Sequence, residues 1–185
     1  MTLRIPRRGL AQAFALIAIL MIDRAVSPQF FNLHLQDGRL FGSVIDVLNR
    51  GTPVALLSLG MVLVIATGGI DLSVGAVMAI AGATAASLAD THSLPVVIAS
   101  ALGVGLVCGL WNGILVAILR IQPIVATLIL MVAGRGIAQL ITEGRIVTFT
   151  SLDLVWIGNG AVLGLPMPIV IAIGMLLVTA AVVRG

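Results

Sequence analysis

The chain has 185 residues, of which 60% are hydrophobic and only 9% are charged. Its arginines outnumber its acidic residues by 10 to 7, for a formal net charge of +3, and the mean hydropathy is +1.23. A soluble domain of this size would expose too much apolar surface, and a disordered chain would be less apolar and more charged. The composition therefore excludes both classes and predicts an integral membrane protein.

The composition also excludes several kinds of chemistry. Every basic residue is arginine, so the lysine that a P-loop uses to hold nucleotide phosphates is absent. The single cysteine, Cys108, rules out an intrachain disulfide and a cysteine-rich metal site. No basic run is longer than Arg7-Arg8, which gives no indication of nucleic-acid binding. We expect no catalytic residues, no metal and no cofactor.

Six stretches are apolar enough for membrane-crossing helices, which need about 20 mostly apolar residues. They are residues 9–26, 52–67, 70–89, 95–119, 122–142 and 165–183. The sequence therefore predicts an all-α, polytopic transmembrane helical bundle over residues 1–185, as a single region. Only Gly68-Gly69 separates the second and third stretches, which predicts a helix broken at this glycine pair.

The first stretch has two interpretations. A basic start followed by an apolar core from Leu10 to Ile22 is typical of a signal peptide, with Ala25-Val26-Ser27 as the cleavage site. Asp23-Arg24 interrupts the cleavage region, which favours an uncleaved membrane anchor.

The orientation follows from the arginines that precede the first span. Arg4, Arg7 and Arg8 lie close together there, and loops rich in positive charge tend to stay in the cytoplasm. With six spans, we expect both termini to be cytoplasmic. Residues 27–51 then form an extracytoplasmic loop.

Asp71 is a charged residue in a predicted span. Charge at hydrocarbon depth costs at least about 2.5–3.5 kcal/mol unless it is paired or hydrated. Asp71 follows the glycine pair closely and is placed to cap the next helix, which is a structural role. It is equally placed to line a permeation path at a broken helix, and the two roles are compatible.

Arg135 lies within the fifth span, on a polar stripe of an otherwise apolar helix. The residues that share this helical face are Thr127, Met131, Arg135, Gln139 and Thr142. Such a stripe faces protein or water rather than lipid, which suggests a pathway. The structural alternative is that Arg135 reaches the membrane surface or pairs with Asp71 or Glu143.

The fourth span carries a tandem GxxxG row, Gly105, Gly109 and Gly113. Small residues allow helix backbones to approach closely in lipid, so we interpret the row as a helix-packing surface. Asn112, at the end of this row, predicts an interhelical hydrogen bond or a ligand contact. The complete set of substrate-pathway candidates is Asp71, Ser73, Asn112, Arg135 and Gln139.

Residues 66–75, Ala-Thr-Gly-Gly-Ile-Asp-Leu-Ser-Val-Gly, resemble a signature of bacterial membrane permeases. The family comprises the permeases of ATP-binding-cassette (ABC) importers for monosaccharides such as ribose, arabinose, xylose and galactofuranose. Residues 111–116, 123–128 and 134–136 are also similar to this family. The loop over residues 35–50 resembles that of the galactofuranose permease in particular.

The resemblance implies a permease subunit that carries a monosaccharide across the bacterial inner membrane and has no enzyme activity of its own. The implied partners are an ABC ATPase subunit, a periplasmic sugar-binding protein and a second permease subunit, with membrane lipid around them. Permeases of this family are longer than this chain, so we expect it to be an N-terminal half that does not transport alone. The alternative is a structural or assembly subunit that does not conduct substrate.

Overall fold

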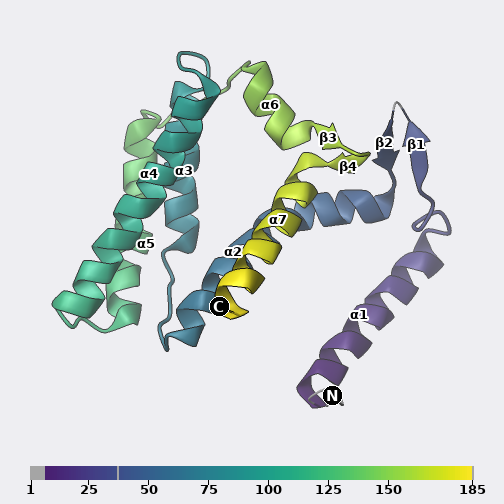
Figure 1. Cartoon of the computed structure of the whole chain (residues 1–185), viewed down its shortest axis with the longest axis horizontal. Helices are drawn as coiled ribbons and strands as arrows, with labels where there is room; N and C mark the ends of the chain where they lie inside the picture. Colours follow the sequence, from purple (N-terminus) through teal and green to yellow (C-terminus); the bar gives the residue numbers. More distant parts are fainter. Residues whose placement is uncertain (1–6, 37, 185) are drawn as a thin grey trace.

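The computed structural model describes residues 7–36 and 38–184, most of which are helical (Figure 1). The helices are α1 (Arg7–Val26), α2 (Ser43–Ala66), α3 (Val74–Leu88), α4 (Leu94–Gly113), α5 (Pro123–Ile141), α6 (Leu152–Asn159) and α7 (Met167–Arg184). A π-helical turn, η1 (Ile114–Ile118), continues α4. Two antiparallel hairpins complete the chain: β1 (His34–Gln36) with β2 (Arg39–Phe41), and β3 (Ala161–Val162) with β4 (Leu165–Pro166).

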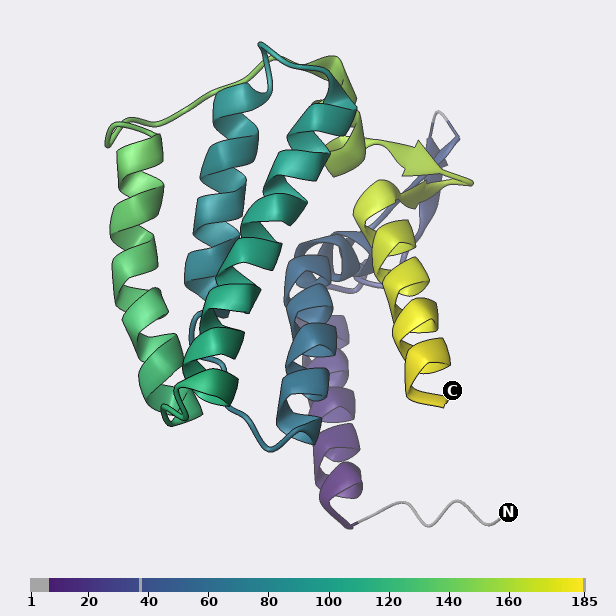
Figure 2. The same ribbon diagram turned by 60° about the vertical axis from the view of Figure 1, so that its left-hand side comes forward.

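The predicted all-α, polytopic membrane bundle is confirmed. Four helical segments are long and apolar enough to cross a membrane: Gly9–Val26, Ser43–Ala66, Leu94–Ile118 and Pro123–Ile141. The helices α3 and α7 are shorter apolar helices at the positions of the other two predicted spans. The start of α1 and the end of α7 lie at the same end of the molecule, as expected for an even number of crossings (Figure 2).

The second helix begins earlier than the sequence predicted. Residues 27–51 are not a loop throughout, because the β1–β2 hairpin occupies part of them and α2 starts at Ser43. Within this first part of α2, Ile45 is buried whereas Asp46 and Arg50 are exposed. The charged side chains lower the hydropathy of this segment, so it was not predicted as part of a span. They do not end the helix, because its polar side is exposed.

The most closely packed part of the molecule is the group of α3, α4 and α5, with α3 in contact with both of the others. Ile80, Cys108 and Leu130 contribute one buried side chain from each helix to a shared apolar core. Gly134 of α5 lies close to α3, because a Cβ atom added there would lie 2.9 Å from the Cβ of Ala76. The α3–α5 crossing therefore depends on a glycine at position 134.

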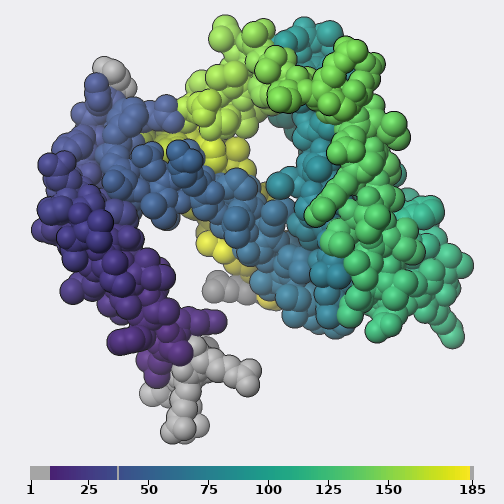
Figure 3. All heavy atoms as spheres, turned by 180° about the vertical axis from the view of Figure 1, so that it is seen from behind, coloured from purple at the N-terminus to yellow at the C-terminus, as the bar shows by residue number. Residues whose placement is uncertain are grey.

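The remaining long helices are arranged more openly. The helix α2 packs along α7, whereas the window Gly9–Val26 of α1 has no buried residue. Figure 3 shows α1 standing to one side, with an opening between the α2–α7 side and the α3–α5 side of the molecule. Large apolar side chains on the outer faces, such as Phe14 and Leu106, are exposed, which is typical of helices that face lipid or another membrane helix.

Asp90, which follows α3, connects two loops at one end of the bundle. Its Oδ1 accepts hydrogen bonds from the backbone N–H groups of Thr150, at 2.8 Å, and Ser151, at 2.9 Å. Ser151 directly precedes α6, so this carboxylate fixes where α6 begins. At the same end, Leu40 donates a backbone hydrogen bond to Gly164 at 2.9 Å, which joins the two hairpins.

The Gly134 contact predicts opposite effects for two neighbouring glycines. We expect Gly134→Ala to lower the free energy of unfolding by about 1–3 kcal/mol, because the added methyl group overpacks the α3–α5 contact. Gly136→Ala on the same helix is the matched control, because a Cβ there meets no atom within 4 Å. It should be neutral or stabilising by up to about 1 kcal/mol, since alanine favours the helix. Thermal unfolding in detergent micelles measures both variants, and equal effects would contradict the prediction.

The Asp90 contact predicts a local change in dynamics. In Asp90→Ala, the amides of Thr150 and Ser151 lose their acceptor, so their hydrogen exchange should be roughly two- to tenfold faster. Asp153→Ala, in the first turn of α6, is the control and should leave these two amides unchanged. Hydrogen exchange at these two amides is measured by mass spectrometry. Equal exchange rates in the two variants would contradict the hydrogen bonds to Asp90.

Candidate functional site

The predicted break at Gly68-Gly69 is present in the structure. The helix α2 ends at Ala66, α3 begins at Val74, and residues 67–73 between them are not helical. The 15 residues of α3 measure about 22 Å at 1.5 Å per residue, less than the roughly 30 Å of a bilayer core. Non-helical backbone therefore completes this crossing and needs its own hydrogen-bond partners.

The end of α2 satisfies its backbone groups locally. Gly68 has a φ of +78°, in the left-handed region that favours glycine. Its N–H donates to the carbonyl of Ile65 at 2.9 Å, and the N–H of Gly69 donates to that of Val64 at 3.1 Å. These two bonds form a Schellman motif, which closes the helix end and turns the chain out of it.

Asp71, Ser73 and Asn112 form one hydrogen-bonded group beside the break. The backbone N–H and the Oγ–H of Ser73 both donate to Oδ1 of Asp71, at 2.7 and 2.6 Å. The Nδ2 of Asn112 on α4 donates to the same Ser73 Oγ at 2.9 Å. Three of the five pathway candidates are thus brought together, and we call them the Asp71–Ser73–Asn112 triad.

The triad corrects the predicted role of Asp71 in detail. The N-cap position of α3 is Ser73, and Asp71 lies two residues before it. Asp71 therefore stabilises the turn that precedes α3 instead of capping the helix directly. Ser73 is completely buried and lies at the centre of the triad, which hydropathy alone did not indicate.

Thr127 of α5 holds the other side of the break. Its side chain is buried, and its Oγ1 lies 2.9 Å from the carbonyl oxygen of Pro123 and 3.4 Å from that of Ile70. The sequence placed Thr127 on the polar stripe of α5 but not among the pathway candidates. The only indication of these contacts in the sequence is that Thr127 lies one helical turn after Pro123, which starts the helix.

Arg135 and Gln139 are not part of the triad. Both residues are exposed on α5, and within the described part of the chain neither side chain forms a hydrogen bond or an ion pair. The structure does not show the pairing of Arg135 with Glu143, because Glu143 pairs with Arg145, with Oε2 and Nη1 3.7 Å apart. The polar stripe thus starts inside the bundle at Thr127 and reaches its surface at Arg135.

The glycine row of α4 does not pack closely against another helix in the described residues. A Cβ atom added at Gly105, Gly109 or Gly113 would meet nothing within 4 Å. Gly105 and Gly109 instead line a groove of about 320 Å³ between α2, α3 and α4, whose polar residues are those of the triad. Gly134 of α5, by contrast, lies in close contact with α3.

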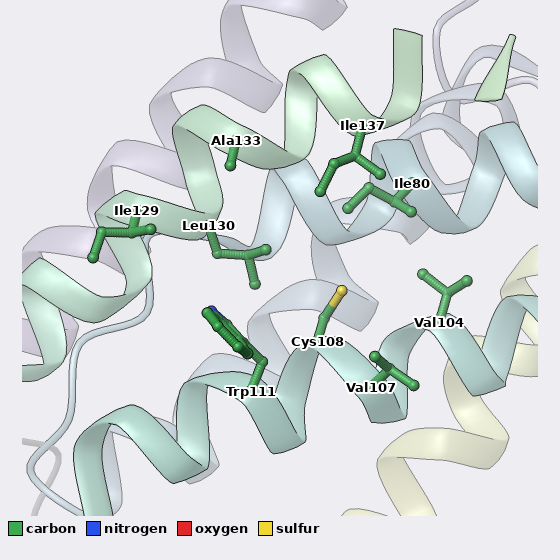
Figure 4. Close-up of a pocket in the computed structure, with 9 residues that line it drawn as sticks. All are labelled: Ile80, Val104, Val107, Cys108, Trp111, Ile129, Leu130, Ala133 and Ile137. Carbon is green, nitrogen blue, oxygen red and sulfur yellow. The ribbon is translucent and has the colours of Figure 1, made fainter. Parts of the chain in front are cut away.

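Two further grooves are almost entirely apolar. One, of about 440 Å³, lies between α4 and α5, and Figure 4 shows Trp111, Cys108 and Leu130 at its walls. The other, of about 420 Å³, lies between α2 and α7 and is lined by residues such as Leu48 and Ile173. Neither offers several hydrogen-bonding groups to a polar ligand. The groove of about 320 Å³ that is lined by the triad, which we call the triad groove, is therefore the candidate functional site.

The buried position of Ser73 predicts that its hydroxyl stabilises the fold. In Ser73→Ala the Nδ2 of Asn112 loses its acceptor, and we expect a loss of about 1–3 kcal/mol in the free energy of unfolding. Ser58→Ala is the control, because the exposed Ser58 hydroxyl bonds only to the carbonyl of Val54 in its own helix. Thermal unfolding in detergent measures both variants. Equal stability would contradict the stabilising role of the Ser73 hydroxyl.

Comparison with known proteins places this chain in a transport family. The sequence profile described as "Branched-chain amino acid transport system / permease component" matches residues 43–183. The galactofuranose transporter permease YtfT of Escherichia coli is 66% identical over 166 residues, which are 89% of this chain and 49% of that protein. The fructose import permease FruF of Bifidobacterium longum is 44% identical over 141 residues, 74% of this chain and 40% of that protein.

A third relative, the ribose import permease RbsC of Escherichia coli, is 37% identical over 161 residues, 84% of this chain and 47% of that protein. The chain thus spans about half the length of the curated relatives it matches. No solved structure matches it. The resemblance seen in the sequence is confirmed, and the chain belongs to the family of membrane permease components that includes these sugar permeases.

Proposed function

We propose that the chain is a permease subunit of an ABC importer and forms part of the pathway for a monosaccharide across the bacterial inner membrane. The names of its relatives support the substrate class, since they are permeases for galactofuranose, fructose and ribose. The observation that carries the proposal is the triad at a broken helix, because it holds polar groups at a depth where lipid tolerates none unpaired.

The proposed partners follow from what the chain lacks and what its relatives are. Without a lysine it has no P-loop, so ATP hydrolysis is assigned to a separate ATPase subunit on the cytoplasmic side. A periplasmic sugar-binding protein delivers the substrate, and a second permease subunit or second half completes the pathway. We infer that both termini are cytoplasmic, and α6 and both hairpins then lie on the periplasmic side.

The proposed pathway uses two polar surfaces. A monosaccharide that leaves water loses hydrogen bonds from its hydroxyl groups, and each unreplaced bond is costly in an apolar medium. Asp71, Ser73 and Asn112 supply replacement groups beside the break. Arg135 and Gln139 form the second surface, on the outside of α5, where they face a further part of the complex or water.

Reconstitution tests the proposed function. Proteoliposomes would contain the chain, the second half of Escherichia coli YtfT, and the ATPase and binding protein of that transporter. We expect ATP-dependent uptake of labelled galactofuranose in this mixture and none when the second half is omitted. YtfT divided at the equivalent position is the positive control. If the divided YtfT transports and the mixture does not, the proposal is wrong.

Arg135 distinguishes a pathway role from a structural one. In the same proteoliposomes, we expect Arg135→Leu to reduce uptake by about tenfold or more, equivalent to at least 1.4 kcal/mol, without lowering the unfolding temperature. Arg145→Leu, which removes an exposed arginine outside the spans, should leave uptake unchanged. A loss of stability in Arg135→Leu with normal uptake per folded molecule would assign Arg135 a structural role.

A further inference from the structure

The triad groove has one polar end and one long apolar side. On α3 it is lined by Val74, Val77, Met78 and Ala81, which follow Ser73 at helical spacing. On α4 it is lined by Gly105, Gly109 and Asn112, which share one face in the same way. The helices are antiparallel neighbours, so the glycines extend away from the triad for about two turns, or roughly 10 Å.

The glycines keep this side of the groove open. Because a Cβ at Gly105 or Gly109 would meet nothing within 4 Å, no neighbouring backbone explains the lack of a side chain there. A larger residue at these positions would instead project into the groove. With Leu57 of α2 on the opposite side, the groove of about 320 Å³ lies within the range of small-molecule sites, roughly 300–1,000 Å³.

The hydrogen-bonding capacity of the triad is incompletely used. Ser73 has one hydroxyl proton, which it donates to Asp71, so its Oγ accepts from the Nδ2 of Asn112. This fixes the amide orientation and leaves Oδ1 of Asn112 buried without a partner among the described residues. Asp71 accepts both of its hydrogen bonds at Oδ1, and no arginine whose side chain the structure describes pairs with it. The two oxygens without a hydrogen-bond partner in the described part of the chain, Oδ1 of Asn112 and Oδ2 of Asp71, are acceptors. Acceptors bind hydroxyl or water protons.

We infer that the triad groove is a hydrated channel for a hydroxyl-rich ligand, with the glycines as its open wall and the triad as its hydrogen-bonding end. The inference rests on the proposed function for the identity of the ligand, a monosaccharide. A sugar matches this lining because its hydroxyl groups supply the donors that the triad needs, while its C–H faces contact the apolar wall. In this inference, Gly105 and Gly109 form the channel wall.

Cysteine labelling tests the hydration of the groove without requiring transport. Cys108→Ala yields a chain without cysteine, into which Gly109→Cys or Gly103→Cys is introduced. Gly103 is the matched control: a Cβ there also meets nothing within 4 Å, but it is not part of the groove lining. Helical geometry places it on the opposite face of α4, beside the exposed Leu106 and Leu110.

In proteoliposomes opened to both sides, a charged, membrane-impermeant methanethiosulfonate should modify Gly109→Cys at least about tenfold faster than Gly103→Cys. The reason is that the reactive thiolate forms in water and not in lipid. Equal and slow rates at the two positions would overturn the inference, whatever the transport assay shows.

Uptake in the reconstituted complex then tests the ligand. Gly109→Phe should reduce sugar uptake by about tenfold or more by filling the groove, whereas Gly103→Phe should leave it unchanged. Equal uptake by both variants, in a complex whose parent chain transports, would show that the groove carries no sugar and overturn the inference. If the parent complex does not transport while the divided YtfT does, the proposed function fails, and the labelling rates alone decide whether the groove is hydrated.

Discussion

Backbone groups at hydrocarbon depth must form hydrogen bonds within the protein, and this constraint decides where the chain can leave a helix. Residues 67–73 do so because both ends of the segment are closed. The Schellman motif at Gly68-Gly69 ends α2, and the Asp71–Ser73 turn starts α3. Thr127 approaches the carbonyl of Ile70 between them. A break without these contacts would cost several kcal/mol for each unpaired group.

The same contacts place a polar site inside an apolar bundle. Asn112 reaches the break from α4 and Thr127 from α5, so both neighbours of α3 hold the segment that precedes it. Gly134 allows α5 to approach α3 closely enough for this arrangement. Packing and polarity are thus coupled: the small residue on α5 brings the helices together, and the hydrogen bonds fix the chain between them.

Candidate residues were easier to predict than their arrangement. Asp71, Ser73 and Asn112 each stood out as polar residues in an apolar stretch, because lipid makes such residues costly. Their grouping did not follow, since Asn112 and Ser73 are 39 residues apart in the chain. The glycine pattern was informative about the shape of the α4 surface, and its packing role stays a prediction. A GxxxG row shows that a helix face is small, and it does not show whether a helix or an open groove meets that face.

The sequence by itself determined the membrane class, the six apolar segments, the break at Gly68-Gly69 and the family. These properties are local, because hydropathy and glycine conformation act over one helix or one turn. Only the tertiary structure decided that the triad forms, that Arg135 lies apart from it, and that Asp90 holds the start of α6. Such contacts depend on how each helix rotates about its axis and crosses its neighbours, which is set by side-chain packing between segments distant in the chain.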